Sequence, residues 1–353
     1  MEARTERKVL RKKILLVLAV CVLATASIYA LISTLHSGGS APPRDRVLAR
    51  FRATLRSYAS VDATTDLLHG ASTSKTAPKG LRAFLGVMSD QRERRDVLRE
   101  TWFPDAEGLQ RLEASAGIRM RFVVGHWSND PERERAMNEE ESELGDILRL
   151  PVNETYTNLP MKTWVFFRTV YDKFTPDYIL KTDDDLYTQV QRLPYAMREW
   201  AADAGDYVGC SFINGEMYDL PRHRFFEPLS FVFGKREYYL FFSGGFYALS
   251  RRAAGLLRRV NFGDMRIGAG EDTTIGLWML AFNVSHTQDP RLCHYECEPD
   301  SIAVTGPCNG LCSPKEKMLE LHADPKCHPQ YRSWLAPPLP PLDLVPVHAW
   351  CQQ

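Results

Sequence analysis

Residues 176–187 read PDYILKTDDDLY, and the rest of the chain is organised around this stretch. A Pro/Asp turn signal precedes the apolar run Tyr178–Leu180, which favours a short buried β-strand. Three consecutive carboxylates, Asp183, Asp184 and Asp185, stand at the far end of that run. The pattern predicts a buried strand that delivers acidic side chains to a cleft.

The acidic triplet is a candidate metal site. Three adjacent carboxylates repel one another unless a cation or solvent offsets their charge, and hard oxygen ligands suit Mg²⁺ or Mn²⁺. Alternate side chains of an extended chain point the same way, so we expect Asp183 and Asp185 to face the site and Asp184 to point elsewhere. A divalent ion held there could bridge to a diphosphate. The alternative for such a triplet is a solvated acidic turn.

Strand and helix patterns alternate along the body of the chain. We predict strands at 81–88, 119–125, 147–152, 178–180, 207–212 and 241–250, and helices at 90–102, 131–144, 161–174, 193–202, 251–260 and 271–282. This alternation indicates an α/β sheet that helices cover on both faces. Ligands of such sheets bind beyond the carboxyl ends of the strands, where the acidic triplet falls.

A second acidic motif and a pair of glycines follow later in the chain. Glu271 and Asp272 open the predicted helix 271–282 after a glycine-rich loop. They either cap the helix and complement its dipole or present a general base at a loop-to-helix junction. Gly244 and Gly245 interrupt an aromatic strand, which indicates either close backbone approach to a ligand or a bulge. The second acidic motif favours a functional role for the first.

The composition is that of a globular protein, with 44% hydrophobic and 25% charged residues among 353. Lys plus Arg equals Asp plus Glu at 44 each. The chain therefore lacks the net positive charge that would indicate a nucleic-acid partner. The functional argument therefore rests on specific sites rather than on the overall field.

The amino-terminal region predicts a membrane anchor. The segment Ile14–Leu35 has no charged residue and is long enough to cross a bilayer as a helix. Basic residues precede it, and the positive-inside rule then keeps the amino terminus cytosolic and places the body in the lumen. We therefore expect type II topology, with a cleaved signal peptide as the competing interpretation. The modest length of the span favours an early secretory membrane.

These signals divide the chain into five expected parts. They are a cytosolic tail at 1–13, a signal anchor at 14–35, a lumenal stem at 36–80, a catalytic domain with a Cys-rich end at 81–330, and a Pro-rich tail at 331–353. Acceptor sequons at Asn153 and Asn283 are compatible with a lumenal body.

Cysteine usage offers two interpretations. Cys21 lies in the predicted span and Cys210 stands alone in the body, while the others crowd the carboxy-terminal region: Cys293, Cys297, Cys308, Cys312, Cys327 and Cys351. Their spacing is similar to that of a zinc site in a cytosolic protein, but a lumenal body favours disulfides. The spacing does not reveal the pairing.

Several motifs occur together between about Leu81 and Cys327. They are the arginine-rich segment Arg94–Trp102, a Leu-x-x-Lys-Thr element at 159–163, Lys181–Asp185, Ser243–Gly245 and Glu271–Thr273. Their types and order resemble glycosyltransferase family 31, the β-1,3-galactosyltransferase-like enzymes of the secretory pathway, in its plant and algal branch. Thr273 stands where that family usually has valine.

The resemblance implies a fold and a reaction. The fold is the GT-A type, a mixed nucleotide-sugar-binding sheet covered by helices. The reaction is inverting, metal-dependent transfer of galactose from UDP-galactose to a glycan or glycoprotein hydroxyl, which forms a β-1,3 linkage in protein glycosylation at the Golgi membrane. Asp272 takes the position of the catalytic base, and Lys181 falls in the nucleotide-sugar site with the acidic triplet Asp183, Asp184 and Asp185.

The resemblance also implies a Mn²⁺ ion, or another divalent cation, held by Asp185 and Asp183. A histidine downstream of the base is expected as a further ligand. His322 is preferred for this role, while His294 and His286 stay open.

Other functions compete with this one. The donor could be another UDP-hexose such as UDP-N-acetylglucosamine, and the body could be an inactive glycan-binding or scaffold member. A zinc-stapled interaction module at the carboxy terminus is a third hypothesis. The acceptor stays open among hydroxyproline-linked glycans, N-glycans and glycosaminoglycan-like linkers.

Overall fold

The computed structural model describes residues 80–327, without residues 214–216, 219, 224–225, 228–237, 239 and 309. All of the described residues belong to one of the chain's two compact units, Pro78–Gln353. The predicted span 14–35 and tail 331–353 lie outside them, as does the predicted stem up to residue 79. Within residues 80–327, no described helix has the length and apolar character needed to cross a bilayer.

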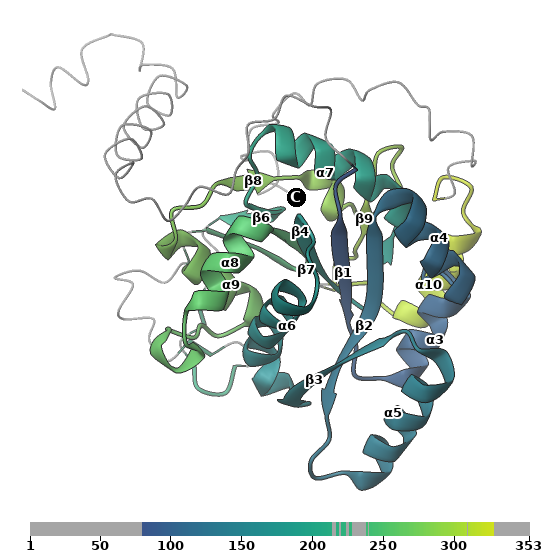
Figure 1. Cartoon of the computed structure of the whole chain (residues 1–353), viewed down its shortest axis with the longest axis horizontal. Helices are drawn as coiled ribbons and strands as arrows, with labels where there is room; N and C mark the ends of the chain where they lie inside the picture. The colour runs from purple at the N-terminus through teal and green to yellow at the C-terminus, as the bar shows by residue number, and fades with distance from the viewer. Residues whose placement is uncertain are drawn as a thin grey trace, which may run out of the picture. The chain divides into compact units, whose positions relative to one another are not determined.

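A mixed sheet forms the centre of this unit. The described residues build seven strands in the order β3-β2-β1-β4-β7-β6-β8 (Figure 1). Only β7 runs against its neighbours among these strands. The bounds are β1 Ala83–Met88, β2 Ile118–His126, β3 Ile147–Asn153, β4 Tyr178–Asp183, β6 Tyr207–Ile213, β7 Leu240–Ser250 and β8 His286–Gln288. A second, two-stranded sheet pairs β5 Tyr187–Thr188 with β9 Ala303–Val304.

Helices cover both faces of the large sheet, which confirms the expected α/β arrangement (Figure 1). Alternate residues of β1 enter two separate cores: Ala83, Leu85 and Val87 pack on one face, and Phe84 and Met88 on the other. The helices are α3 Arg92–Glu100, α4 Ala106–Ala116, α5 Pro131–Leu144, α6 Leu159–Lys173, α7 Leu193–Ala202, α8 Arg251–Arg259, α9 Glu271–Ala281 and α10 Pro314–Ala323. The helices α6, α8 and α9 cover the face of Phe84.

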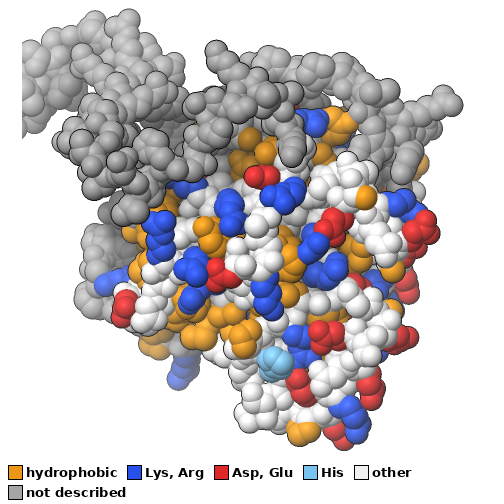
Figure 2. Space-filling model, in the orientation of Figure 1, with side chains coloured by type: hydrophobic (Ala, Val, Ile, Leu, Met, Phe, Trp, Pro, Cys, Tyr) orange, Lys and Arg blue, Asp and Glu red, His pale blue; other side chains and the backbone are white. Residues whose placement is uncertain are grey.

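The arginine-rich motif mostly builds the fold. Arg95 of α3 is buried, and its Nη2 lies 2.6 Å from Glu140 Oε2 of α5. Arg99 contacts the other oxygen of Glu140 at 2.7 Å and Asp146 Oδ2 at 2.9 Å. These buried charges are paired, as buried charges must be. On the outer surface of α5, acidic and basic side chains stand interspersed (Figure 2).

The carboxylate of Glu134 joins α5 to the end of β2 and to β3. It accepts hydrogen bonds from the Trp127 N–H at 2.9 Å and the Arg149 guanidinium at 2.6 Å, and it lies 3.0 Å from His126 Nδ1. Burial alone would raise the pKa of Glu134, but these partners outweigh it and lower the pKa from 4.5 to about 2.

A pH dependence of stability follows from this shift. Because the folded-state pKa is lowered, the contribution of Glu134 is fully present above pH 4.5 and is lost as the pH falls towards 2. We expect Glu134→Gln to lower Tm at pH 7 and to have almost no effect on Tm near pH 2. Thermal unfolding across this range checks the prediction, with Glu132→Gln, an exposed neighbour on α5, as the control. An equal loss of Tm at both pH values would contradict it.

The predicted disulfides are confirmed among the described cysteines. Six sulfurs form three bonds: Cys210–Cys293, Cys297–Cys327 and Cys308–Cys312. The zinc interpretation is therefore wrong for the described cysteines of the carboxy-terminal region, while Cys351 lies outside the described residues. Cys210 is not alone, because it joins β6 to the Cys-rich region across 83 residues. Long loops closed in this way restrict the unfolded chain most.

Candidate active site

A buried lysine joins the acidic and glycine motifs. Lys181 is fully buried near the end of β4. Its Nζ lies 2.6 Å from Asp183 Oδ1 and 3.3 Å from Glu271 Oε2, and it donates a hydrogen bond to the Gly244 carbonyl. Three motifs far apart in the sequence therefore meet at one ammonium group.

Strand pairing explains this meeting. β7 lies antiparallel to β4 with Tyr247 opposite Lys181 and Phe246 opposite Thr182. The preceding residues of β7, Gly244 and Gly245, therefore lie at the carboxyl end of β4, close to the start of α9 at Glu271.

Of the two interpretations of the paired glycines, the strand pairing supports the bulge, and the close approach of a ligand stays a prediction. The two glycines lie in an irregular part of the β6–β7 pairing. Gly209 pairs with Tyr247 and Ser211 with Phe242, so residues 243–246 of β7 bulge between these two pairs. Gly244 also lies close to the carboxylates at the start of α9. A Cβ on Gly244 would lie 3.3 Å from Glu271 Oε2 and 3.4 Å from Asp272 Oδ2. An added methyl group at Gly244 would therefore touch both carboxylates of the second acidic motif.

The resemblance assigns the role of base to Asp272, yet Glu271 is the more buried member of the motif. Its carboxylate accepts a hydrogen bond from the Tyr247 hydroxyl and pairs with Lys181. Burial raises the pKa of Glu271, against the attraction of Lys181. For Lys181 the balance is reversed: burial alone would lower its pKa, but the carboxylates of Asp183 and Glu271 outweigh that effect and raise it. Lys181 thus balances charge between the two acidic motifs.

Asp272 presents its carboxylate where the loop meets α9. Its Oδ2 accepts a hydrogen bond from the Gly244 N–H at 3.3 Å, and its Oδ1 accepts one from the Thr273 N–H at 2.8 Å. Burial raises the pKa of Asp272 above its ordinary value despite these donors. A carboxylate held by two backbone donors and with a raised pKa has the orientation and basicity that a general base needs.

Thr273 stabilises this junction. Its Oγ1 donates to the Gly270 carbonyl at 3.1 Å and accepts from the Gly270 N–H at 2.9 Å, so it caps the first turn of α9. The valine usual at this place in the resembling family has no such group. Thr273 therefore fixes the start of the helix that carries Asp272.

The acidic triplet spreads its three carboxylates over different surroundings. Asp183 pairs with Lys181, while Asp184 lies 3.5 Å from Arg94 Nη1 of α3. The Oδ1 atom of Asp185 is buried and has no hydrogen-bond partner. Burial, together with Asp183 and Asp184, raises the pKa of Asp185 to about 7. The charge of this triplet is therefore only partly offset by the protein.

The donor set of the triplet suits a divalent cation. Carboxylate oxygens are the ligands of Mg²⁺ and Mn²⁺, and a cation would satisfy the buried Asp185 oxygen. No cluster of three or more His, Cys, Asp or Glu side chains in the described part of the chain is arranged to hold a metal by itself. Such an ion is usually bound by one or two carboxylates together with substrate phosphates and water, and the triplet offers carboxylates for that mode.

The three candidate histidines occupy different places. His322 of α10 has its Nδ1 3.2 Å from the Tyr187 hydroxyl, on the strand that follows the triplet. The Nδ1 of His294 lies 2.7 Å from Ser301 Oγ, and the backbone of His294 bridges to β9. His286 lies on the edge strand β8. The preference for His322 as a ligand stays a prediction.

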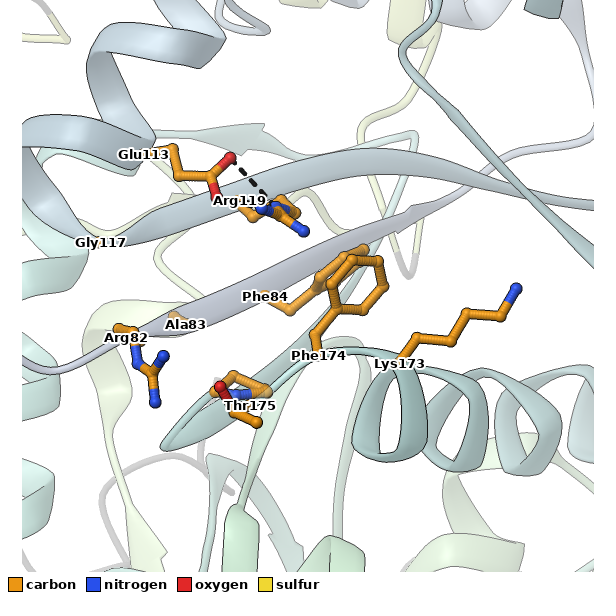
Figure 3. A pocket seen from close by; sticks show the side chains of 10 residues that line it. Arg82, Ala83, Phe84, Glu113, Gly117, Arg119, Lys173, Phe174 and Thr175 are labelled. Carbon is orange, nitrogen blue, oxygen red and sulfur yellow. Dashed lines mark hydrogen bonds and ion pairs between the residues drawn. The ribbon is translucent and has the colours of Figure 1, made fainter.

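A pocket of about 250 Å³ lies at the opposite edge of the sheet, where the strands begin. It is lined by Arg82, Ala83, Phe84, Glu113, Gly117, Arg119, Lys173, Phe174, Thr175 and Pro176. In Figure 3 Arg119 turns towards Glu113, while Arg82 and Lys173 extend in different directions. The cationic side chains of this pocket do not converge, and the pocket is remote from the acidic motifs. We therefore place the candidate active site at the carboxyl ends of the strands.

Comparisons with known proteins point to one family. The family model described as galactosyltransferase matches residues 93–290. The chain is 38% identical over 249 residues to the probable beta-1,3-galactosyltransferase 13 of Arabidopsis thaliana, which covers 69% of this chain and 72% of that protein. It is 36% identical over 269 residues to the probable beta-1,3-galactosyltransferase 12 of the same plant, covering 75% and 70%. A solved glycosyltransferase involved in the glycosylation of the major capsid of PBCV-1 is similar with a TM-score of 0.36 and 11% identity, covering 68% of this chain and 99% of that chain.

Proposed function

The chain belongs to the galactosyltransferase family, and on that premise we propose that it transfers galactose from UDP-galactose to a hydroxyl of a glycan or glycoprotein. The proposed product has a β-1,3 linkage, as the names of the relatives suggest, and the reaction inverts the anomeric carbon. The mixed sheet with acidic motifs beyond the end of β4 supports a GT-A-type site. The observation that supports the assignment most is the buried Lys181 amine, which contacts both acidic motifs.

Asp272 is the proposed general base. It would take the proton of the acceptor hydroxyl, whose oxygen forms the new bond to the anomeric carbon while the bond from that carbon to UDP breaks. Inversion requires the base and the leaving group to lie on opposite faces of the sugar. Two acidic motifs on separate elements, at the end of β4 and the start of α9, suit that requirement.

Asp183 and Asp185 are the proposed metal ligands, with His322 as a further candidate. When bound, a divalent cation such as Mn²⁺ would neutralise the charge that develops on the departing diphosphate. Lys181 holds Asp183 in place and offsets part of its charge before any substrate binds. Asp184, which lies near Arg94, would line the nucleotide-sugar site without binding the ion.

The proposed location is the Golgi membrane, with type II topology and a lumenal body. Three disulfides among the described cysteines support an oxidising compartment. The uncharged segment Ile14–Leu35 and the basic residues before it support the orientation.

Donor choice and metal dependence can be tested together. We expect the full chain, purified in mild detergent, to release UDP from UDP-galactose in the presence of a glycan acceptor panel and Mn²⁺. EDTA and the Asp185→Ala substitution should each remove this activity, because both take away the proposed offset of diphosphate charge. A coupled assay for UDP, run in parallel with UDP-N-acetylglucosamine and UDP-glucose, makes the measurement.

Two results would contradict this proposal. Faster release from UDP-N-acetylglucosamine than from UDP-galactose would overturn the donor. The absence of both UDP release and Mn²⁺-dependent UDP binding would instead favour an inactive scaffold.

A further inference from the structure

The Cys-rich region contacts the acidic turn through β9 and through Gly310 and Leu311. On one side β9 pairs with β5, which begins two residues after Asp185, and places Val304 opposite Tyr187. On the other side the Leu311 N–H donates a hydrogen bond to the Asp185 carbonyl at 2.8 Å. Leu311 is itself buried in the same core as Tyr187. The Cys-rich region therefore contacts both the turn and the strand that follows it.

Gly310 sits directly over the Asp185 side chain. A Cβ on Gly310 would lie 2.3 Å from Asp185 Oδ2 and 2.5 Å from its Cγ, distances that no real contact allows. The backbone at Gly310 has φ 146°, a conformation that other residues rarely adopt. Only glycine can therefore stand here with the Asp185 carboxylate in its present place.

The disulfide Cys308–Cys312 closes the loop that carries Gly310. Gly306 tightens the same loop, because a Cβ on it would lie 2.7 Å from the Gly310 carbonyl oxygen. An isolated bridge joins Pro307 to Gly310. The described residues of this loop, 306–308 and 310–312, are thus constrained by a covalent bond and by close backbone packing.

We propose that this disulfide-closed loop positions Asp185 for the reaction, and that Gly310 is the positioning residue that sets where the Asp185 carboxylate lies. The inference rests on the proposed function, since it concerns a proposed metal ligand. The Leu311 N–H holds the backbone of Asp185 through a hydrogen bond, and Gly310 lies close enough to the Asp185 carboxylate to limit where that carboxylate can move. The buried Oδ1 of Asp185 has no hydrogen-bond partner, so no donor holds that oxygen in place.

The first test measures metal-dependent binding. We expect Gly310→Ala in the full chain to raise the Mn²⁺ concentration needed for half-maximal UDP binding about 10-fold or more, as loss of a group that orients a ligand does. Isothermal titration with UDP at several Mn²⁺ concentrations makes the measurement without turnover. Gly145→Ala is the matched control, because Gly145 also has a positive φ but no heavy atom within 4 Å of an added Cβ. Unchanged Mn²⁺ dependence in Gly310→Ala would overturn the proposal.

The second test is a double-mutant cycle measured by thermal unfolding. Its second substitution, Asp185→Ala, removes the carboxylate that the new methyl group would meet. We expect Gly310→Ala to lower Tm less in the Asp185→Ala background than in the wild-type protein. Equal losses in both backgrounds would show that Gly310 does not act through Asp185 and would overturn the proposal. If wild type showed no Mn²⁺-dependent UDP binding, the proposed function would fail, and this cycle would still decide whether Gly310 positions Asp185.

A third variant guards against misfolding of Gly310→Ala. The double substitution Cys308→Ser and Cys312→Ser opens the loop without adding an atom over Asp185. We expect this double variant, like Gly310→Ala, to need a higher Mn²⁺ concentration for half-maximal UDP binding. Wild-type Mn²⁺ dependence in this variant would contradict a role for the closed loop.

Discussion

Substitution of Asp272 by Asn is expected to lower kcat with UDP-galactose by about two to four orders of magnitude, the usual contribution of a general base. Asn has nearly the same shape but cannot accept the acceptor's proton. KM for UDP-galactose should change little, because Asp272 is proposed to act on the acceptor hydroxyl. Steady-state kinetics with each substrate varied in turn makes the measurement.

The fold should survive this substitution. Asp272 accepts hydrogen bonds from the Gly244 and Thr273 N–H groups, one on each carboxylate oxygen. Asn has a single acceptor oxygen and can keep only one of these two bonds. The expected loss of stability is therefore about 1 kcal/mol, one net hydrogen bond. Asp264→Asn, at an exposed carboxylate before the same loop, is the control. A folded Asp272→Asn protein that keeps more than a tenth of the wild-type kcat would exclude Asp272 as the base.

Substitution of Lys181 by Met should have the largest effect on stability. It removes a fully buried ammonium group that pairs with Asp183 and Glu271, and it leaves two carboxylates without their partner. Loss of one partner from a buried ion pair costs about 3–5 kcal/mol. Activity should also fall, because Lys181 holds the two acidic motifs together. Urea unfolding gives the free energy, and UDP release gives the activity.

Two further variants separate these effects of Lys181. Lys162→Met removes another buried amine, 2.8 Å from Glu154 and outside the acidic motifs, and should cost stability with little loss of activity per folded molecule. Adding Glu271→Gln to Lys181→Met removes one unpaired charge and should restore part of the lost stability. A Lys181→Met protein as stable as wild type would refute the charge-balancing role.

The sheet could be predicted because its signals are local. The apolar run at 81–88 and the helical spacing at 131–144 are visible in short windows, and both elements formed close to their expected bounds. The helix α4 was missed because it has small and polar residues and buries only Leu112. The strands β5 and β9 were missed because two-residue strands have no period to detect, and their pairing joins Tyr187 to Val304 across the chain.

The site was predicted less completely than the fold, for a similar reason. The acidic residues themselves stand out in the sequence, but the partners that fix them are distant. Nothing near Lys181 in the sequence indicates Glu271 or the Gly244 carbonyl, and nothing near Cys210 indicates Cys293. These contacts arise from β7 lying beside β4 and from the Cys-rich region returning to the sheet, so only the tertiary structure reveals them.

The most direct test of the central claim is the structure of the product itself. The wild-type chain should be incubated with UDP-galactose, Mn²⁺ and the acceptor that supports the fastest UDP release, and the product analysed by NMR. The proposal predicts a new galactose in the β configuration, attached to the 3-hydroxyl of the acceptor sugar, and no such product from Asp272→Asn. A galactose in the α configuration, or one attached at another hydroxyl, would contradict an inverting β-1,3-galactosyltransferase.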